Sequence, residues 1–139
     1  MPKFSIWAIR FALAYLLLGF TLGALLLINK AVPFHPTIWG LLPLHIEFLL
    51  MGWIVQLVFA VGYWIFPRFT FEPKRGRQGL AWLALLFLNA GIGTNTVAAF
   101  SAEPSWQLIG RALEVAAVAA FASQLWYRVK PTETGLKAG

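Results

Sequence analysis

Four ionisable side chains interrupt long apolar stretches of this 139-residue chain, namely His45, Glu47, Arg111 and Glu114. An ionisable group inside a membrane-spanning helix is costly, and it is a functional-site hypothesis that needs a partner. At about 1.5 Å of rise per helical residue, all four lie in the same half of the expected spans. Asn95 lies at a similar depth on another apolar stretch. We therefore expect these polar groups to be related rather than independent.

His45 could bind iron. It begins a series of three- and four-residue steps that places its members on one helix face, and these are Leu49, Gly52, Gln56, Phe59 and Tyr63. Gly52 removes a side chain where a flat ligand on the imidazole would lie. Burial keeps an imidazole neutral and able to coordinate, so the pattern suits a haem. Arg111, together with Lys30 and outer-edge tryptophans, could pair with the haem carboxylates. A histidine that is only hydrogen-bonded in the core is the alternative.

The other polar residues also have simpler interpretations. Glu47 stands roughly 200° around a helix from His45, so it faces elsewhere and Arg111 is its simplest partner. Arg111 and Glu114 are three residues apart and can neutralise each other. His35, which precedes Pro36, is either a capping residue or a second iron ligand. The groups expected to support the site are Glu47, Asn95, Glu114 and Gln56.

The composition identifies the elements that must hold these residues. Hydrophobic residues make up 60% of the chain and charged residues 12%, which excludes an ordinary soluble domain. Four spans of about 20 residues fill the length, at about 7–28, 41–66, 79–100 and 105–127. We predict an all-α integral membrane protein with a single four-helix domain over 1–130 and a disordered cytoplasmic tail over 131–139. Gly19, Gly23, Gly91 and Gly93 are expected to be helix-packing notches.

Basic residues predict the orientation. Nearly all of them fall on one side of the expected spans, at Lys3, Arg10, Arg68, Lys74, Arg75, Arg77, Arg128, Lys130 and Lys137, and Lys30 falls on the other. Basic loops stay cytoplasmic, so both termini are expected in the cytoplasm of a multi-pass protein of the inner membrane. The net charge of +6 is spread over loops, which favours membrane orientation over nucleic-acid binding. The absence of cysteine excludes disulfides, thiolate metal sites, iron–sulfur clusters and covalent haem attachment.

The second span resembles a known helix. Three segments of this span are Pro43-Leu44-His45, Met51-Gly52-Trp53 and Gly62-Tyr63-Trp64-Ile65-Phe66-Pro67-Arg68. They are similar to the second helix of haem–copper oxidase subunit I, most closely in C-type oxidases and nitric oxide reductases and in small subunit-I-like membrane proteins. The resemblance covers about a fifth of the chain. It implies that His45 is an axial ligand of low-spin haem b. The family's copper-binding histidines lie on later helices, and this chain has two histidines in all, so the resemblance implies a haem b protein rather than a complete oxidase.

These observations predict a small membrane cytochrome b that transfers electrons to or from a quinone or a redox protein. The second axial ligand could be His45 of a second copy in a homodimer or His35, or the iron could stay five-coordinate. The five-coordinate case would give a module that binds or senses a gas. A haem-free structural or assembly protein of a respiratory complex is a further alternative. The sequence supports no enzymatic activity beyond the redox site.

Overall fold

The computed structural model describes residues 1–69, 75–101, 103–126 and 128–129. In this part of the chain four helices are long and apolar enough to cross a membrane, at Lys3–Ala31, Pro36–Ile65, Gln78–Ala98 and Pro104–Trp126. They confirm the prediction of an all-helical protein with four candidate spans. The expected tail over 131–139 lies outside the described residues.

The elements follow the expected order. They are α1 (Lys3–Ala31), the 3-10 turn η1 (Pro36–Leu41), α2 (Leu42–Glu47), the π-helical segment η2 (Phe48–Val55), α3 (Gln56–Ile65), α4 (Gln78–Ala98) and α5 (Pro104–Trp126). From η1 to α3 the chain forms one candidate span.

Prolines fix several helix ends, because proline lacks a backbone N–H and its ring clashes with the preceding turn. Pro33 follows the end of α1, and Pro67 follows the end of α3. Pro36, Pro43 and Pro104 instead lie in the first turns of η1, α2 and α5. In a first turn the missing N–H has no intrahelical acceptor to lose.

The second span changes its helix type over η2, which is eight residues long. A π turn holds more residues than an α turn, so it rotates the residues after it relative to those before it. Such segments are rare and often lie at functional sites. Here η2 directly follows the turn of α2 that carries His45 and Glu47.

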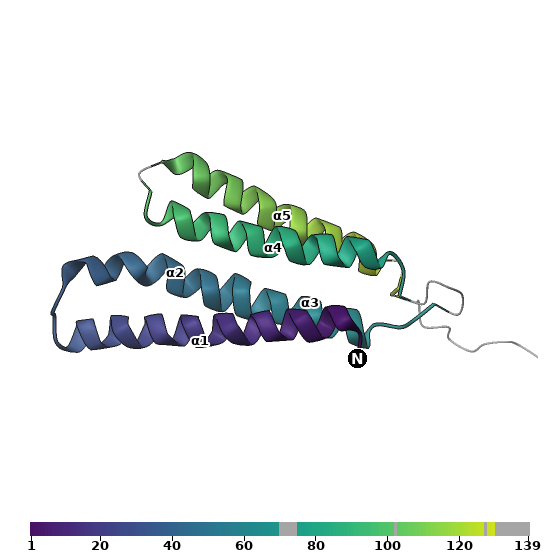
Figure 1. The fold of residues 1–139 in the computed structure, drawn as a ribbon, viewed down its shortest axis with the longest axis horizontal. Coiled ribbons are helices and arrows are strands. Elements are labelled where there is room, and N and C mark those ends of the chain that lie inside the picture. Colours follow the sequence, from purple (N-terminus) through teal and green to yellow (C-terminus); the bar gives the residue numbers. More distant parts are fainter. Residues whose placement is uncertain (70–74, 102, 127, 130–139) are drawn as a thin grey trace, which may run out of the picture.

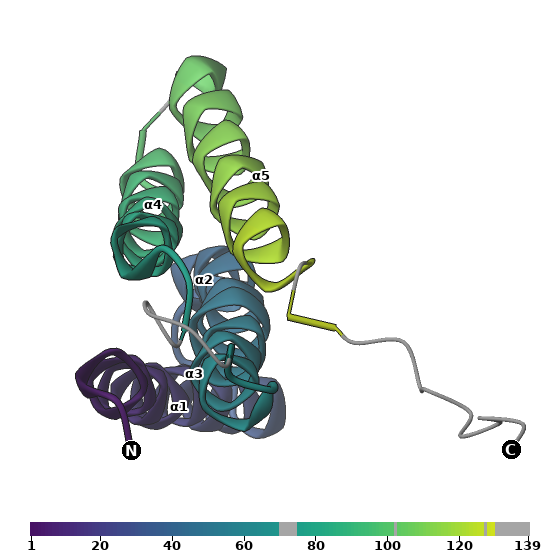
Figure 2. The same cartoon turned by 90° about the vertical axis from the view of Figure 1, so that its right-hand side faces the viewer.

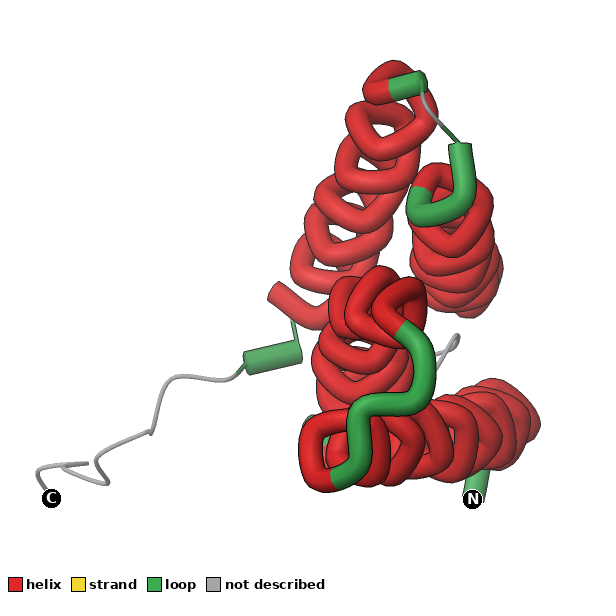
Figure 3. The backbone as a smooth tube through the Cα atoms, turned by 90° about the vertical axis from the view of Figure 1, so that its left-hand side faces the viewer, coloured by secondary structure: helices red, strands yellow, loops and turns green. Residues whose placement is uncertain are grey.

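The helices form two hairpins. α1 packs along α2, η2 and α3, and α4 packs along α5 (Figures 1 and 2). The α1–η1 and α4–α5 connections lie at one end, and the N-terminal end of α1 lies with the C-terminal end of α5 at the other (Figures 1 and 3). Following the orientation predicted from the basic residues, we call the first end the outer end and the second the inner end.

Aromatic residues hold the inner half of the bundle together. The rings of Phe59 and Phe121 stack with their centres 4.0 Å apart, and the Phe4 and Tyr63 rings lie 4.7 Å apart. Ser5 Oγ donates to the carbonyl oxygen of Ala60 at 2.7 Å. These contacts join α1, α3 and α5, whereas His45, Glu47, Asn95, Arg111 and Glu114 lie nearer the outer end.

Candidate functional site

The imidazole of His45 is held by the backbone of α1. Its Nδ1 atom lies 2.8 Å from the carbonyl oxygen of Gly19. Because a carbonyl oxygen can only accept, Nδ1 carries the hydrogen, and in the neutral ring Nε2 keeps its lone pair. Histidines that bind metals commonly donate their other ring N–H to a carboxylate or a backbone carbonyl. His45 therefore has the tautomer and the fixed orientation that an Nε2 ligand needs.

Two glycines of α1 make room for this arrangement. A Cβ atom on Gly23 would lie 2.7 Å from Cε1 of His45, and one on Gly19 would lie 2.7 Å from Cγ of Leu49. At such distances a larger residue would displace the His45 ring or the Leu49 side chain, so these two glycines are packing notches as predicted. Gly91 is also a notch, with a hypothetical Cβ 2.8 Å from Cγ of Glu114, whereas Gly93 has open space there, so the prediction for Gly93 was wrong.

A groove between α1 and α2 borders the His45 ring. Its volume is about 480 Å³, and its lining residues are Phe20, Gly23, Ala24, Leu26, Leu27, Lys30, Trp39, Leu42 and His45. Sites for small molecules and cofactors commonly measure about 300–1,000 Å³ and are mostly apolar with a few polar groups. Phe20, Leu27 and Leu42 are exposed on this face. We call this feature the α1/α2 groove.

The other residues on the helix face of His45 pack against α1. Leu49 meets Gly19, the ring of Tyr15 fills the space beside Gly52, and Gln56 Nε2 donates to the carbonyl oxygen of Ala8 at 3.3 Å. All three contacts are with α1. The structure therefore does not support the expectation that Leu49 and Gly52 line a ligand of His45, because helix packing already occupies that space.

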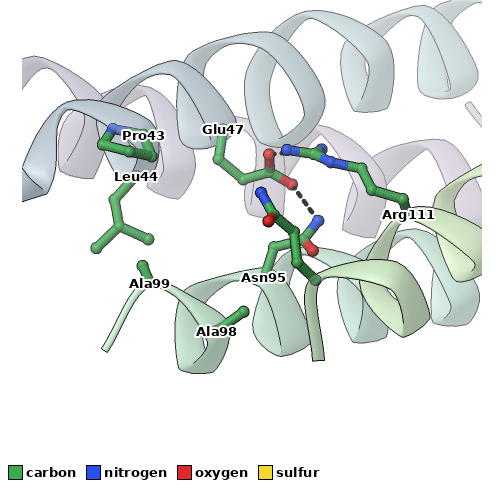
Figure 4. Close-up of a pocket in the computed structure, with 8 residues that line it drawn as sticks. Pro43, Leu44, Glu47, Asn95, Ala98, Ala99 and Arg111 are labelled. Atoms are coloured by element: carbon green, nitrogen blue, oxygen red, sulfur yellow. Dashed lines mark hydrogen bonds and ion pairs between the residues drawn. The ribbon is translucent and has the colours of Figure 1, made fainter. Parts of the chain in front are cut away.

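The second polar feature joins α2, α4 and α5, and we call its four residues, Glu47, Asn95, Arg111 and Glu114, the Glu47 cluster. Arg111 Nη1 lies 2.8 Å from Glu47 Oε2 and 2.8 Å from Glu114 Oε2. Asn95 Nδ2 donates to Glu47 Oε1 at 3.0 Å and to Glu114 Oε1 at 2.8 Å. Figure 4 shows Glu47 between Arg111 and Asn95. Both predicted ion pairs of Arg111 are thus confirmed.

The Glu47 cluster lies away from the α1/α2 groove. It borders a separate cavity of about 170 Å³ lined by Pro43, Leu44, Glu47, Asn95, Ala98, Ala99, Gln107 and Arg111. The Arg111 side chain is 50% exposed and the two carboxylates are 5% exposed. The structure therefore does not support the expectation that Arg111 pairs with carboxylates of a ligand of His45. Lys30 is the basic residue that lines the groove.

A hydrogen-bonded network in the middle of the bundle contains Gln56, which was named from the sequence, and Asn89, which was not. Asn89 Nδ2 donates to Gln56 Oε1 at 2.9 Å, and the Tyr15 hydroxyl donates to Asn89 Oδ1 at 3.1 Å. The network connects α1, α3 and α4. Gln56 was singled out as a support of the His45 site, and the structure places it here instead. An amide within an apolar run was the available signal for Asn89.

His35 caps η1. Its Nδ1 accepts from the backbone N–H of Thr37 at 3.4 Å and lies 2.6 Å from Thr37 Oγ1, as the capping interpretation predicted. Within the described ranges, no contact joins His35 to His45, and no three His, Cys, Asp or Glu side chains gather as a metal site.

Comparisons with protein-family models, with curated proteins and with solved structures found no match for this chain. The likeness of the second span to haem–copper oxidase subunit I therefore stays a resemblance of one segment.

Proposed function

We propose that this protein is a membrane-embedded b-type haem protein in which His45 is an axial ligand through Nε2. The observation that carries the proposal is the hydrogen bond from His45 Nδ1 to the Gly19 carbonyl oxygen, which leaves Nε2 as the lone-pair atom. Gly23 supports it, because a Cβ atom at this position would lie 2.7 Å from Cε1 of His45 and displace the ring. The resemblance of Pro43-Leu44-His45 to a haem-ligand motif points the same way.

The α1/α2 groove has the composition that a haem requires. Its apolar walls suit a porphyrin face, and Lys30 can pair with a carboxylate. When bound, haem iron would supply one-electron chemistry, with a potential set by its ligands and its surroundings. The protein's own part is to orient His45 and to provide an apolar environment around its Nε2 atom.

A second copy of the chain would complete the coordination. The groove carries one histidine and opens on a face whose large apolar side chains are exposed. In a two-fold symmetric dimer the same face of each copy meets the other, so His45 of each chain would reach one haem. In this arrangement the protein passes electrons to or from a quinone or a redox protein in the cytoplasmic membrane.

Absorption spectra of the purified protein, oxidised and then reduced with dithionite, test the proposal. We expect sharp Soret and α bands and one haem for every two chains. His45→Ala should remove the bands. His35→Ala is the matched control and should keep them, because the described contacts hold His35 in the η1 cap.

Two results would change the assignment. A reduced spectrum that shifts with carbon monoxide would indicate five-coordinate iron and a gas-binding module. The absence of a Soret band after haem is supplied would refute the haem proposal and favour a haem-free structural protein.

A further inference from the structure

Arg128 holds a buried positive charge at the inner end. This residue is 1% exposed. Its Nη2 atom donates to the carbonyl oxygens of Tyr63 at 3.1 Å and Phe66 at 2.6 Å, and its Nε donates to that of Pro67 at 3.0 Å. The Tyr63 carbonyl lies in the last turn of α3, where carbonyls lack intrahelical donors, and the other two belong to the residues that follow the helix. The remaining nitrogen, Nη1, is buried without a hydrogen-bond partner.

A second guanidinium shares this neighbourhood. Arg128 and Arg75 lie 5.3 and 6.0 Å from the centre of the Tyr63 ring, and Nη1 of Arg75 is also buried without a hydrogen-bond partner. Burial is the main cause that lowers the pKa of Arg128, and the positive charge of Arg75 acts in the same direction. An unpaired buried charge is unfavourable, so an anion here would stabilise both groups.

The local charge is strongly positive. The connection between α3 and α4 carries Arg68, Lys74, Arg75 and Arg77 against the single acid Glu72. Among the described residues the acids are Glu47, Glu103 and Glu114, which lie in the outer half or in the outer connection. The described part of the inner end therefore offers cations without carboxylates.

A cavity of about 460 Å³ lies at the same end of the bundle, and it is lined by one arginine, Arg77. Its lining residues are Phe69, Gly76, Arg77, Leu80, Ser123 and Gln124. Gln124 Nε2 donates to the Arg75 carbonyl oxygen at 2.7 Å, and its Oε1 is buried without a hydrogen-bond partner. The cavity also adjoins the first turn of α4, where backbone N–H groups lack intrahelical acceptors and favour an anion. It thus presents several donors, one buried acceptor, and the apolar side chains of Phe69 and Leu80.

We propose that this cavity, at the inner end between the α3–α4 connection, α4 and α5, binds the headgroup of an anionic phospholipid. Arg77 lines the cavity and provides the positive charge for the phosphate. Arg75 and Arg128 do not line it and add to the positive potential of this end. The unpartnered Gln124 oxygen suits a headgroup hydroxyl, such as the glycerol hydroxyls of phosphatidylglycerol. A lipid fits better than a free anion, because the cavity has apolar walls and lies at the end of the candidate spans, where basic pockets meet anionic headgroups.

Lipid titration of the purified full-length protein in neutral detergent tests this proposal. Phosphatidylglycerol, phosphatidylcholine and inorganic phosphate are added in separate arms, and the unfolding midpoint is followed. We expect phosphatidylglycerol to raise the midpoint and the other two to have little effect. Arg77→Gln should raise the concentration needed for the half-maximal shift about tenfold, because a charge-assisted hydrogen bond is lost.

Arg68→Gln is the matched control, since Arg68 is exposed on the same connection and the variant loses the same charge. It should titrate like the unmodified protein. Arg77→Gln is the variant that decides, because Arg77 lines the cavity. Equal shifts with phosphatidylcholine, equal titrations of the Arg77 and Arg68 variants, or a full shift with inorganic phosphate alone would each overturn the proposal.

Discussion

Arg111→Gln tests how net charge controls the Glu47 cluster. The substitution leaves Glu47 and Glu114 without the guanidinium that lies 2.8 Å from each. Breaking a buried ion pair costs about 3–5 kcal/mol. Since half of the Arg111 side chain is exposed, water screens part of this interaction, and we expect a loss of about 2 kcal/mol in the free energy of unfolding.

The same charge count predicts the rank of the carboxylate variants. Two carboxylates and one guanidinium carry a formal charge of −1, so Glu47→Gln makes the cluster formally neutral. We expect that variant to lose less than about 1 kcal/mol, because the amide still accepts hydrogen bonds. The double variant Glu47→Gln/Glu114→Gln leaves only the half-exposed guanidinium, and it should fall between the other two.

Equilibrium unfolding in mixed micelles with increasing sodium dodecyl sulfate, followed by tryptophan fluorescence, measures these differences. Glu103→Gln is the control, because it removes an exposed acid from the α4–α5 connection and should change the free energy by less than about 0.5 kcal/mol. A Glu47→Gln variant as unstable as Arg111→Gln would refute the reasoning, since the carboxylate itself would then matter more than the charge balance.

Two further predictions concern the packing of the second span. Gly52→Ala should lower the unfolding midpoint by an amount equivalent to about 1–3 kcal/mol, because the Tyr15 ring occupies the position of the added Cβ. Gly93→Ala should not lower the midpoint, because that position is open. Equal losses of stability in the two variants would contradict this account. Arg128→Gln should lower the free energy of unfolding by about 1–3 kcal/mol and speed amide hydrogen exchange in the inner-half helices, since three carbonyl oxygens lose their donor. Arg68→Gln is the control. Equal amide exchange rates in the two variants would contradict the role of Arg128 as a cap.

Part of the candidate site could be predicted from periodicity alone. Glu47 stands roughly 200° from His45 on an α-helix, and the structure turns Glu47 toward Arg111 and His45 toward Gly19. The Arg111–Glu114 pair followed from its three-residue spacing. Such local relations survive folding, because helix geometry fixes them before any tertiary contact forms.

The contacts made by the helix face that carries His45 could not be predicted in the same way. Periodicity showed that Leu49 and Gly52 share a face, but it could not show that Gly19 and Tyr15 of α1 occupy the space opposite that face. The π-helical segment also changes the rotation of the second span, and no pattern in the apolar run marks it. Arg75 and Arg128 likewise served in the sequence only to predict the membrane orientation, and their shared contact with Tyr63 could not be predicted.

The sequence by itself determined the four long helices and their approximate ends, because apolar length, proline positions and basic connections act within one segment. It also determined which few polar residues lie within the apolar stretches and are therefore candidates for a functional site. Only the tertiary structure decided what each helix face meets: a backbone carbonyl fixes the His45 tautomer, the Glu47 cluster takes Arg111 away from the groove, and two guanidiniums come together beside Tyr63. The physical reason is that these contacts depend on how separate helices pack, and side-chain fit between distant segments sets that packing.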